Sequence, residues 1–102
     1  MALDKKFLKS RPVCKVRFSI SSEEANGASE GCVVGEFNEW DPAAYPLKLQ
    51  KDGSLSAEFE IPIGREYRFR YLVDKNRWLN DSQADGYEYC PFASCDNSLL
   101  NI

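Results

Sequence analysis

Short runs in which apolar and polar residues alternate constrain the fold of this chain more than any other feature of the sequence. The clearest run is Val13–Ile20, in which apolar residues occupy every second position. Because successive side chains of a strand point to opposite faces, this alternation predicts a strand with one buried face. Similar alternation, or a short apolar run between turn residues, predicts six more strands: 31–34, 47–49, 55–61, 66–73, 77–79 and 98–102.

Turn residues separate these predicted strands at short intervals. Asp52-Gly53 is the strongest hairpin signal in the chain. About seven short strands in 102 residues are typical of a two-sheet sandwich, and the length suffices for one domain only. We therefore predict an all-β, immunoglobulin-like β-sandwich of about seven to eight strands over residues 12–102, after an N-terminal lead-in at residues 1–11. The predicted core includes Val16, Phe18, Val33, Phe59, Phe69 and Tyr71.

The charges of the chain argue against nucleic acid or a membrane as a partner. The net charge is −3, and acidic and basic residues are interleaved. The basic cluster of Lys5, Lys6, Lys9 and Arg11 lies in the predicted lead-in and is expected to be solvated. No apolar run approaches the roughly 18 to 20 residues of a membrane span, and the N-terminus lacks the pattern of a signal peptide. A cytoplasmic location is therefore expected.

The four cysteines do not show the pattern of a metal site. Cys14 and Cys32 lie in apolar strand patterns and are expected in the core. Cys90 and Cys95 lie in a polar, proline-containing segment, 80–96, without the paired short spacings of a zinc site. Because thiols in the cytosol are usually kept reduced, we expect neither zinc nor a redox pair here, and no cofactor.

The sequence contains few of the residue combinations that catalytic sites require. It contains no histidine, so a Ser-His or Cys-His couple cannot form. A glycosidase needs two carboxylates about 5 to 9.5 Å apart across a cleft, and a small sandwich has little concavity to hold them. Asp74, Asp81, Asp85 and Glu88 are candidates by residue type alone, and acidic residues in turns are usually solvated. We expect no catalytic residues.

Two tryptophans, Trp40 and Trp78, lie beside predicted turns. Each either closes an end of the sandwich core or stands exposed as part of a binding surface, and residue type leaves both interpretations open. An exposed pair suits a sugar, because the C–H-rich face of a pyranose packs on an indole while its hydroxyl groups need fixed donors and acceptors. Arg70, outward on its strand, and Asn97, at a loop end, supply such groups.

Four segments stand out when they are taken together: Val33-Val34-Gly35-Glu36-Phe37-Asn38-Glu39-Trp40, Tyr67-Arg68-Phe69-Arg70-Tyr71-Leu72-Val73-Asp74, Trp78 and Asp96-Asn97-Ser98. They resemble carbohydrate-binding module family 48, from about Val13 to the C-terminus. That family includes the glycogen-binding domain of the AMP-activated protein kinase β subunit and the early-set N-terminal domains of isoamylases and branching enzymes. The resemblance implies an early-set fold in which Trp40 and Trp78 stack on glucose rings, and in which Arg70 and Asn97 bond sugar hydroxyls.

The chain departs from the family pattern at several positions, among them Arg70, Lys75 and Ala93, the last at a position where related sequences tend to have glycine. Arg70 stands where the family has lysine, which keeps the charge but replaces a point donor by a planar fork. Lys75 follows Asp74 where the family often has glycine. Asn76 can take the left-handed conformation that such a turn needs, so we expect the turn to shift by one residue.

The residues and the resemblance lead to one main expectation. The chain is a non-catalytic module that binds α-1,4-glucans such as glycogen, starch, maltooligosaccharides and cyclodextrin. A shallow site of this kind implies a dissociation constant of roughly 10 μM to 1 mM. The alternative is a scaffold domain that has lost the sugar and docks on a separately encoded glucan-metabolising enzyme. A hydrolase is the third hypothesis.

Overall fold

The computed structural model describes residues 2–92 and 94–102, which form an all-β fold. Every strand pair among these residues is antiparallel. One turn of 3-10 helix, η1 (Glu36–Asn38), follows the third strand. The strands are β1 (Ala2–Phe7), β2 (Val13–Ile20), β3 (Gly31–Gly35), β4 (Pro46–Leu49), β5 (Leu55–Pro62), β6 (Glu66–Val73), β7 (Arg77–Leu79), β8 (Gly86–Cys90) and β9 (Cys95–Asn101).

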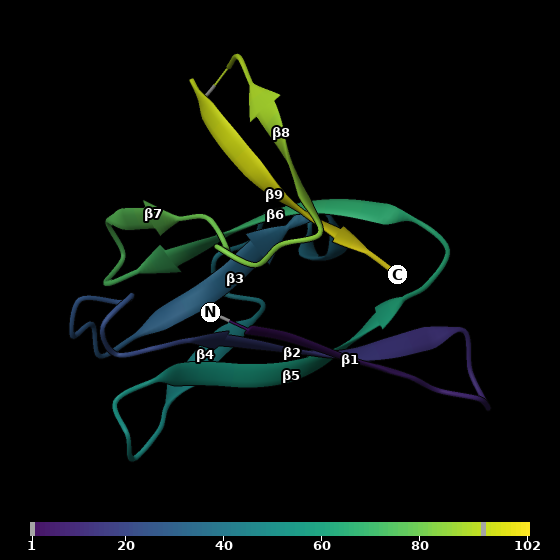
Figure 1. Cartoon of the computed structure of the whole chain (residues 1–102), viewed down its shortest axis with the longest axis horizontal. Helices are drawn as coiled ribbons and strands as arrows, with labels where there is room; N and C mark the ends of the chain where they lie inside the picture. The colour runs from purple at the N-terminus through teal and green to yellow at the C-terminus, as the bar shows by residue number, and fades with distance from the viewer. Residues whose placement is uncertain (1, 93) are drawn as a thin grey trace.

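The strands form two facing layers that are joined through β4 (Figure 1). One layer has the order β1-β2-β5-β4, and the other has the order β3-β6-β9-β8 with β7 beside β6. β4 belongs to both layers, because Lys48 and Leu49 pair with β5 while Pro46 and Leu47 pair with β3. Without β7 and β8, this is the strand order of an immunoglobulin-like sandwich. The predicted fold class is confirmed.

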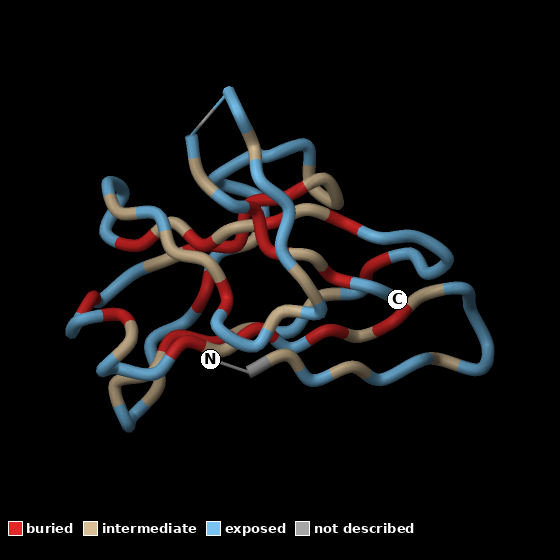
Figure 2. The backbone as a smooth tube through the Cα atoms, turned by 45° about the horizontal axis from the view of Figure 1, so that its top comes forward, coloured by how far each residue is buried: buried red, intermediate tan, exposed pale blue. Residues whose placement is uncertain are grey.

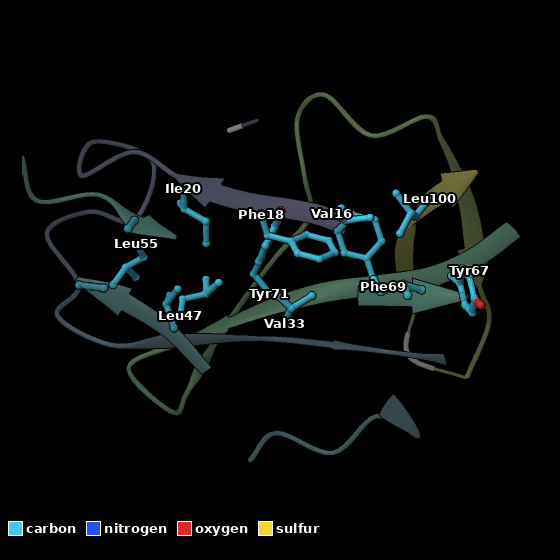
Figure 3. Packing of buried hydrophobic residues seen from close by; sticks show 14 of the residues in the cluster. Val16, Phe18, Ile20, Val33, Leu47, Leu55, Tyr67, Phe69, Tyr71 and Leu100 are labelled. Carbon is cyan, nitrogen blue, oxygen red and sulfur yellow. The ribbon is translucent and has the colours of Figure 1, made fainter. Parts of the chain in front are cut away.

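The core lies between β2 and β6, whose buried side chains face each other (Figure 3). The ring of Phe18 lies 5.5 Å from that of Phe69 and 6.2 Å from that of Tyr71, and both contacts are edge-on. Burying an aromatic or branched side chain of this kind stabilises the fold by about 1.5 to 3 kcal/mol. The buried residues of the two strands are Cys14, Val16, Phe18 and Ile20 on β2, and Tyr67, Phe69, Tyr71 and Val73 on β6.

One of the predicted core residues lies outside the fully buried set. Phe59 on β5 is only partly buried, and its ring stacks on Tyr45 with centroids 4.2 Å apart. The other predicted core residues are fully buried: Val16, Phe18, Val33, Phe69 and Tyr71. Phe59 therefore belongs to an aromatic stack at the margin of the core rather than to its centre.

The two ends of the strand order are the strands that the sequence pattern did not predict. β1 lies within residues 1–11, where Met1 is outside the described residues, and it pairs with β2 along its whole length. The segment thus contributes an edge strand, while Lys6, Lys9 and Arg11 of its basic cluster are exposed, as expected. β8 lies within the polar segment 80–96, and among the described residues it pairs with β9 only. Edge strands bury little and often carry charge, so they lack the apolar alternation of inner strands.

A salt bridge links these two edges of the sheet. Lys5 Nζ on β1 lies 2.7 Å from Asp85 Oδ2, just before β8, and it also donates to the carbonyl of Asn101 at 3.1 Å. The same Asp85 oxygen accepts the Asn101 N–H at 2.7 Å. The sheet therefore curls until its first and last strands share contacts.

Burial follows the inner strands, as Figure 2 shows. Exposed chain is concentrated in the turns and along β8, most of whose residues are exposed. No helix in the described part of the chain has the length and apolar character that crossing a membrane requires.

Candidate functional site

The outward face of β6 carries the polar residues that the sequence singled out. Phe69 and Tyr71 are buried in the core. The alternation of the strand therefore turns Arg68, Arg70 and Leu72 to the opposite face. Directly opposite residues of antiparallel strands share a face, so the neighbours of these residues can be read from the register.

The register brings Trp78 to the same outward face. Trp78 on β7 pairs with Leu72, which pairs on its other side with Cys32 of β3, and Arg70 pairs with Val34. Trp78 is 45% exposed, and the guanidinium carbon of Arg70 lies 5.1 Å from the centre of its ring. The two side chains form one surface that is aromatic and cationic at once.

The turn that precedes Trp78 differs from the prediction. Asp74 and Lys75 have φ values of 49° and 64°, whereas Asn76 is not left-handed. The N–H of Asn76 donates to the carbonyl of Val73 at 3.3 Å, so Asp74 and Lys75 are the two central residues of the turn. Positive φ at both central residues is the type I′ geometry that suits the twist of a hairpin. The expected shift of the turn to Asn76 is therefore wrong.

The segment that leads to Trp40 starts at a very close contact. Gly35 pairs with Phe69, and a Cβ at position 35 would lie 2.7 Å from the carbonyl oxygen of Arg68 and 2.8 Å from the Cβ of Phe69. Both distances are shorter than real Cβ contacts, so only glycine fits at this position. Gly35, the glycine of the segment that resembles the family, is thus needed for the close packing of β3 against β6.

Asn38 and Phe37 hold the turn that follows. The amide oxygen of Asn38 accepts the N–H of Gly35 at 3.1 Å, and its amide nitrogen donates to the carbonyl of Val33 at 2.9 Å. The ring of Phe37 stacks on Tyr45 with centroids 5.4 Å apart. These contacts attach η1 to the end of β3 and direct the chain outward again.

Trp40 ends this segment in a strained and exposed conformation. Glu39 and Trp40 have φ values of 57° and 59°, and the N–H of Trp40 donates to the carbonyl of Gly35 at 2.9 Å. Left-handed backbone is rare for a bulky residue and costs about 1 to 3 kcal/mol, and it is found most often at functional sites. Trp40 is 38% exposed. Of the two interpretations that residue type left open, the exposed position is the one that both Trp40 and Trp78 take.

Arg70 lies between the two tryptophans along β6. Trp40 is attached beside the strand partner of Phe69, and Trp78 is the strand partner of Leu72. The two anchoring points, on β3 and on β7, lie on opposite sides of β6 and are offset by three residues, or about 10 Å, along its direction.

The donors of Arg70 have no acceptor within the described residues. Its Nε is covered and has no hydrogen-bond partner, and the side chain forms no ion pair in this part of the chain. A covered donor without a partner costs about 1 to 3 kcal/mol. Arg70 is thus held by its contact with the ring of Trp78 and keeps its hydrogen-bonding capacity.

Arg68, two residues earlier on the same face, is fully engaged. Its Nη2 lies 2.7 Å from Glu88 Oε1, and its Nη1 lies 3.1 Å from Glu36 Oε2. Its backbone N–H donates to the other oxygen of Glu36 at 2.7 Å. The hydrogen bond to Glu88, together with the charges of Glu88 and Glu36, raises the pKa of Arg68.

Asn97 lies within β9 rather than at a loop end. It is the partner of Glu88 on β8, and because Ser98 beside it is buried in the core, Asn97 points outward. The pairing of β6 with β9 ends at Phe69 and Ser98, so Asn97 stands one residue further along, at the level of Arg70. It is 8% exposed, which limits it to a small contact.

A groove of about 480 Å³ opens beside this surface. Its lining includes Leu72, the strand partner of Trp78, and Pro42, which follows Trp40 closely in the sequence. Through Leu72 the groove lies next to Trp78 on the outward face. Its lining consists of Glu30, Gly31, Cys32, Pro42, Ala43, Pro46, Leu47, Leu72 and Lys75.

Asp81, one of the carboxylates of the enzyme hypothesis, belongs to a buried network. It accepts the hydroxyl of Tyr71 at 2.6 Å and the N–H of Gln83 at 2.8 Å, and its own N–H donates to Ser98 Oγ at 2.9 Å. The hydroxyl of Tyr87 donates to its carbonyl. Burial, aided by the charge of Asp81 and the hydrogen bond to it, raises the pKa of Tyr71 well above its ordinary value. The network attaches the loop before β8 to the core.

The other three carboxylates of the enzyme hypothesis have partners or positions of their own, apart from Asp81. Asp85 is bonded to Lys5, Glu88 is bonded to Arg68, and Asp74 lies in the exposed turn after β6. Within residues 2–92 and 94–102, no group of three or more histidine, cysteine or acidic side chains is placed to hold a metal ion.

Comparison of the chain with protein-family models and with curated protein sequences found no match. The candidate site is therefore defined by the positions of its residues in the structure, without support from a known relative. The fold brings Arg70 and Trp78 together on the outward face of β6 and β7, Trp40 is exposed beside the end of β3, and Asn97 lies on a neighbouring strand, mostly covered. Sequence reasoning missed Leu72, although its alternation with Tyr71 in β6 was a usable signal.

Proposed function

We propose that this chain is a non-catalytic carbohydrate-binding domain of the family 48 type, and that α-1,4-glucans bind on the outward face of β3, β6 and β7. One observation carries the proposal. Two exposed indoles are anchored on either side of Arg70, whose donors have no acceptor in the described part of the chain. The segments that resemble the family supply the same residues.

Trp40, Trp78 and Arg70 match the chemistry of a sugar. Each indole offers an apolar face to the C–H groups of a pyranose, while the guanidinium fork of Arg70 donates to its hydroxyls. An α-1,4-linked chain curves, so its successive rings turn toward two separated indoles instead of lying on one flat platform.

The groove supports an extended ligand rather than a single sugar. A chain that stacks on Trp78 passes over Leu72 and reaches the space between β3 and Pro42. Additional rings placed there bury further C–H surface. Affinity should therefore rise from maltotriose to maltoheptaose.

Titration with maltoheptaose tests the proposal. The wild-type chain should bind with a dissociation constant of roughly 10 μM to 1 mM. Trp40→Ala and Trp78→Ala should each weaken binding at least about tenfold, which corresponds to roughly 1.4 kcal/mol, while circular dichroism and Tm show a folded domain. The chain has only two tryptophans, so quenching of indole fluorescence reports the site directly.

Two controls make the result specific. Phe7→Ala removes another exposed aromatic, 56% exposed on β1 of the opposite layer, and should leave affinity unchanged. A β-1,4-linked glucan of similar length should bind more weakly than maltoheptaose. If NMR spectra of the wild-type chain do not respond to maltoheptaose or β-cyclodextrin, the sugar proposal fails and the scaffold hypothesis replaces it.

A further inference from the structure

Two cysteines occupy directly opposite positions at the end of the β8–β9 hairpin. Cys90 is the last residue of β8, Cys95 is the first residue of β9, and the two are strand partners. Both carry free thiols and are partly exposed. Figure 1 shows this hairpin projecting from the body of the sandwich.

The register satisfies the geometry of a disulfide. Directly opposite residues of an antiparallel pair have Cα atoms about 4.5 to 5.5 Å apart, with side chains on one face. A disulfide spans Cα atoms about 4.4 to 6.8 Å apart. Cys90 and Cys95 can therefore be bridged without a large movement of the backbone, although their spacing in the sequence did not predict a redox pair.

The other two cysteines are poorly placed to compete. Cys14 and Cys32 are buried, on β2 and β3. Burial raises the pKa of both thiols, which lowers the fraction of reactive thiolate. Oxidants in solution therefore meet Cys90 and Cys95 first.

We propose that Cys90 and Cys95 form a reversible disulfide in exchange with a low-molecular-weight disulfide such as oxidised glutathione. One thiolate attacks a glutathione sulfur, which forms a mixed disulfide and releases one glutathione thiolate. The second cysteine then attacks the protein-side sulfur and releases the second glutathione. Two protein thiols are oxidised by two electrons, and one glutathione disulfide is reduced to two thiols.

The cross-link acts on the strand that carries Asn97. β9 pairs with β6 only from Ser98 to Asn101, so the preceding residues depend on β8 and on one hydrogen bond from Asn80 to the carbonyl of Asp96. A bridge at Cys95 limits opening of this part of the hairpin and so preorganises Asn97. This consequence rests on the proposed function, and oxidation should tighten maltoheptaose binding by about two- to fivefold because less ordering accompanies binding.

Equilibration of the full chain in glutathione redox buffers, followed by alkylation and mass spectrometry, tests the disulfide. No lysine or arginine follows Arg77, so trypsin leaves both cysteines in the single peptide 78–102. That peptide should lose two hydrogen atoms in the oxidised buffer and regain them with dithiothreitol, while Cys14 and Cys32 remain alkylatable after unfolding. The oxidised chain should also show a Tm higher by about 5 °C.

Single substitutions provide the matched controls. Cys90→Ser and Cys95→Ser should each accumulate a glutathione adduct on the remaining cysteine, because the second exchange step has no partner. The proposal is overturned if the wild-type chain keeps four free thiols in the oxidised buffer, or if its disulfides join two chains or involve Cys14 or Cys32.

The sugar measurement is read separately from the disulfide. If the disulfide forms but affinity for maltoheptaose is the same in both redox states, the link to Asn97 is wrong. If neither state binds any glucan, the proposed function fails, and the thiol measurement still decides whether the redox pair exists.

Discussion

Arg68 and Arg70 occupy successive outward positions of β6, yet they belong to two different kinds of surface. The guanidinium of Arg68 forms ion pairs with the carboxylates of Glu36 and Glu88. Arg70 has no carboxylate partner in the described part of the chain and lies over the ring of Trp78. The residue type, the strand and the face are the same. The neighbours that the fold supplies therefore decide which arginine holds the structure together and which remains available to a ligand.

Glu36→Ala should produce the largest change, and it should affect stability. The substitution leaves the N–H of Arg68 without its acceptor and removes one of the two carboxylates on the guanidinium. A loss of about 2 kcal/mol is expected, which lowers Tm by roughly 8 to 16 °C in thermal unfolding. Glu36→Gln keeps an acceptor for the N–H and should lose about half as much. Equal losses in both variants would show that the carboxylate charge alone matters.

Arg70→Ala should instead affect binding. Loss of a charged hydrogen-bond donor should weaken maltoheptaose affinity by about 1 to 2 kcal/mol, or roughly five- to thirtyfold in titration calorimetry. Because Arg70 forms no ion pair with the residues that the structure describes, Tm should change little. Unchanged affinity in this variant would remove Arg70 from the site.

Arg68→Ala is the matching substitution at the arginine that is paired with carboxylates. Its guanidinium and Glu88 are both well exposed, and ion pairs of this kind contribute little. Tm should therefore fall by less than about 4 °C, and sugar affinity should stay within about twofold of wild type. A loss of affinity as large as that of Arg70→Ala would contradict the distinction between the two arginines.

Raising the salt concentration should have the smallest effect of these changes. Of Arg68 and Arg70, it should weaken the contacts of Arg68 only. Raising sodium chloride from about 0.05 to 0.5 M screens the exposed contacts of Arg68, so the Tm difference between wild type and Arg68→Ala should narrow. Glucans are neutral, and maltoheptaose affinity should not change over the same range. A salt-dependent affinity would indicate that the natural ligand carries charge.

The inner strands of the sandwich were predictable, and the two outermost strands were not. β2 and β6 present apolar residues at every second position, because one face of each lies against the core. β1 and β8 are edge strands, and most described residues of β8 are exposed. Without a buried face, the side chains of β8 carry no pattern that separates a strand from a polar loop.

The candidate site was predictable in part. Residue type left the exposure of Trp40 and Trp78 open, the resemblance to a sugar-binding family favoured it, and both residues are exposed. The covering of Asn97 was missed, because burial in β9 depends on strands that precede it far back in the chain. The left-handed backbone at Trp40 was missed as well, since it results from hydrogen bonds of Asn38 and Gly35 rather than from residue preference.

The sequence by itself determined the fold class and most of the strands, because local alternation and turn chemistry act between residues close in the chain. Only the tertiary structure decided which of the two arginines, Arg68 or Arg70, contacts carboxylates. Arg68 meets carboxylates 32 and 20 residues away, while Arg70 meets none in the described residues. It also decided that Cys90 faces Cys95. Such partners are set by strand register, and register depends on the packing of the whole sheet rather than on spacing along the chain.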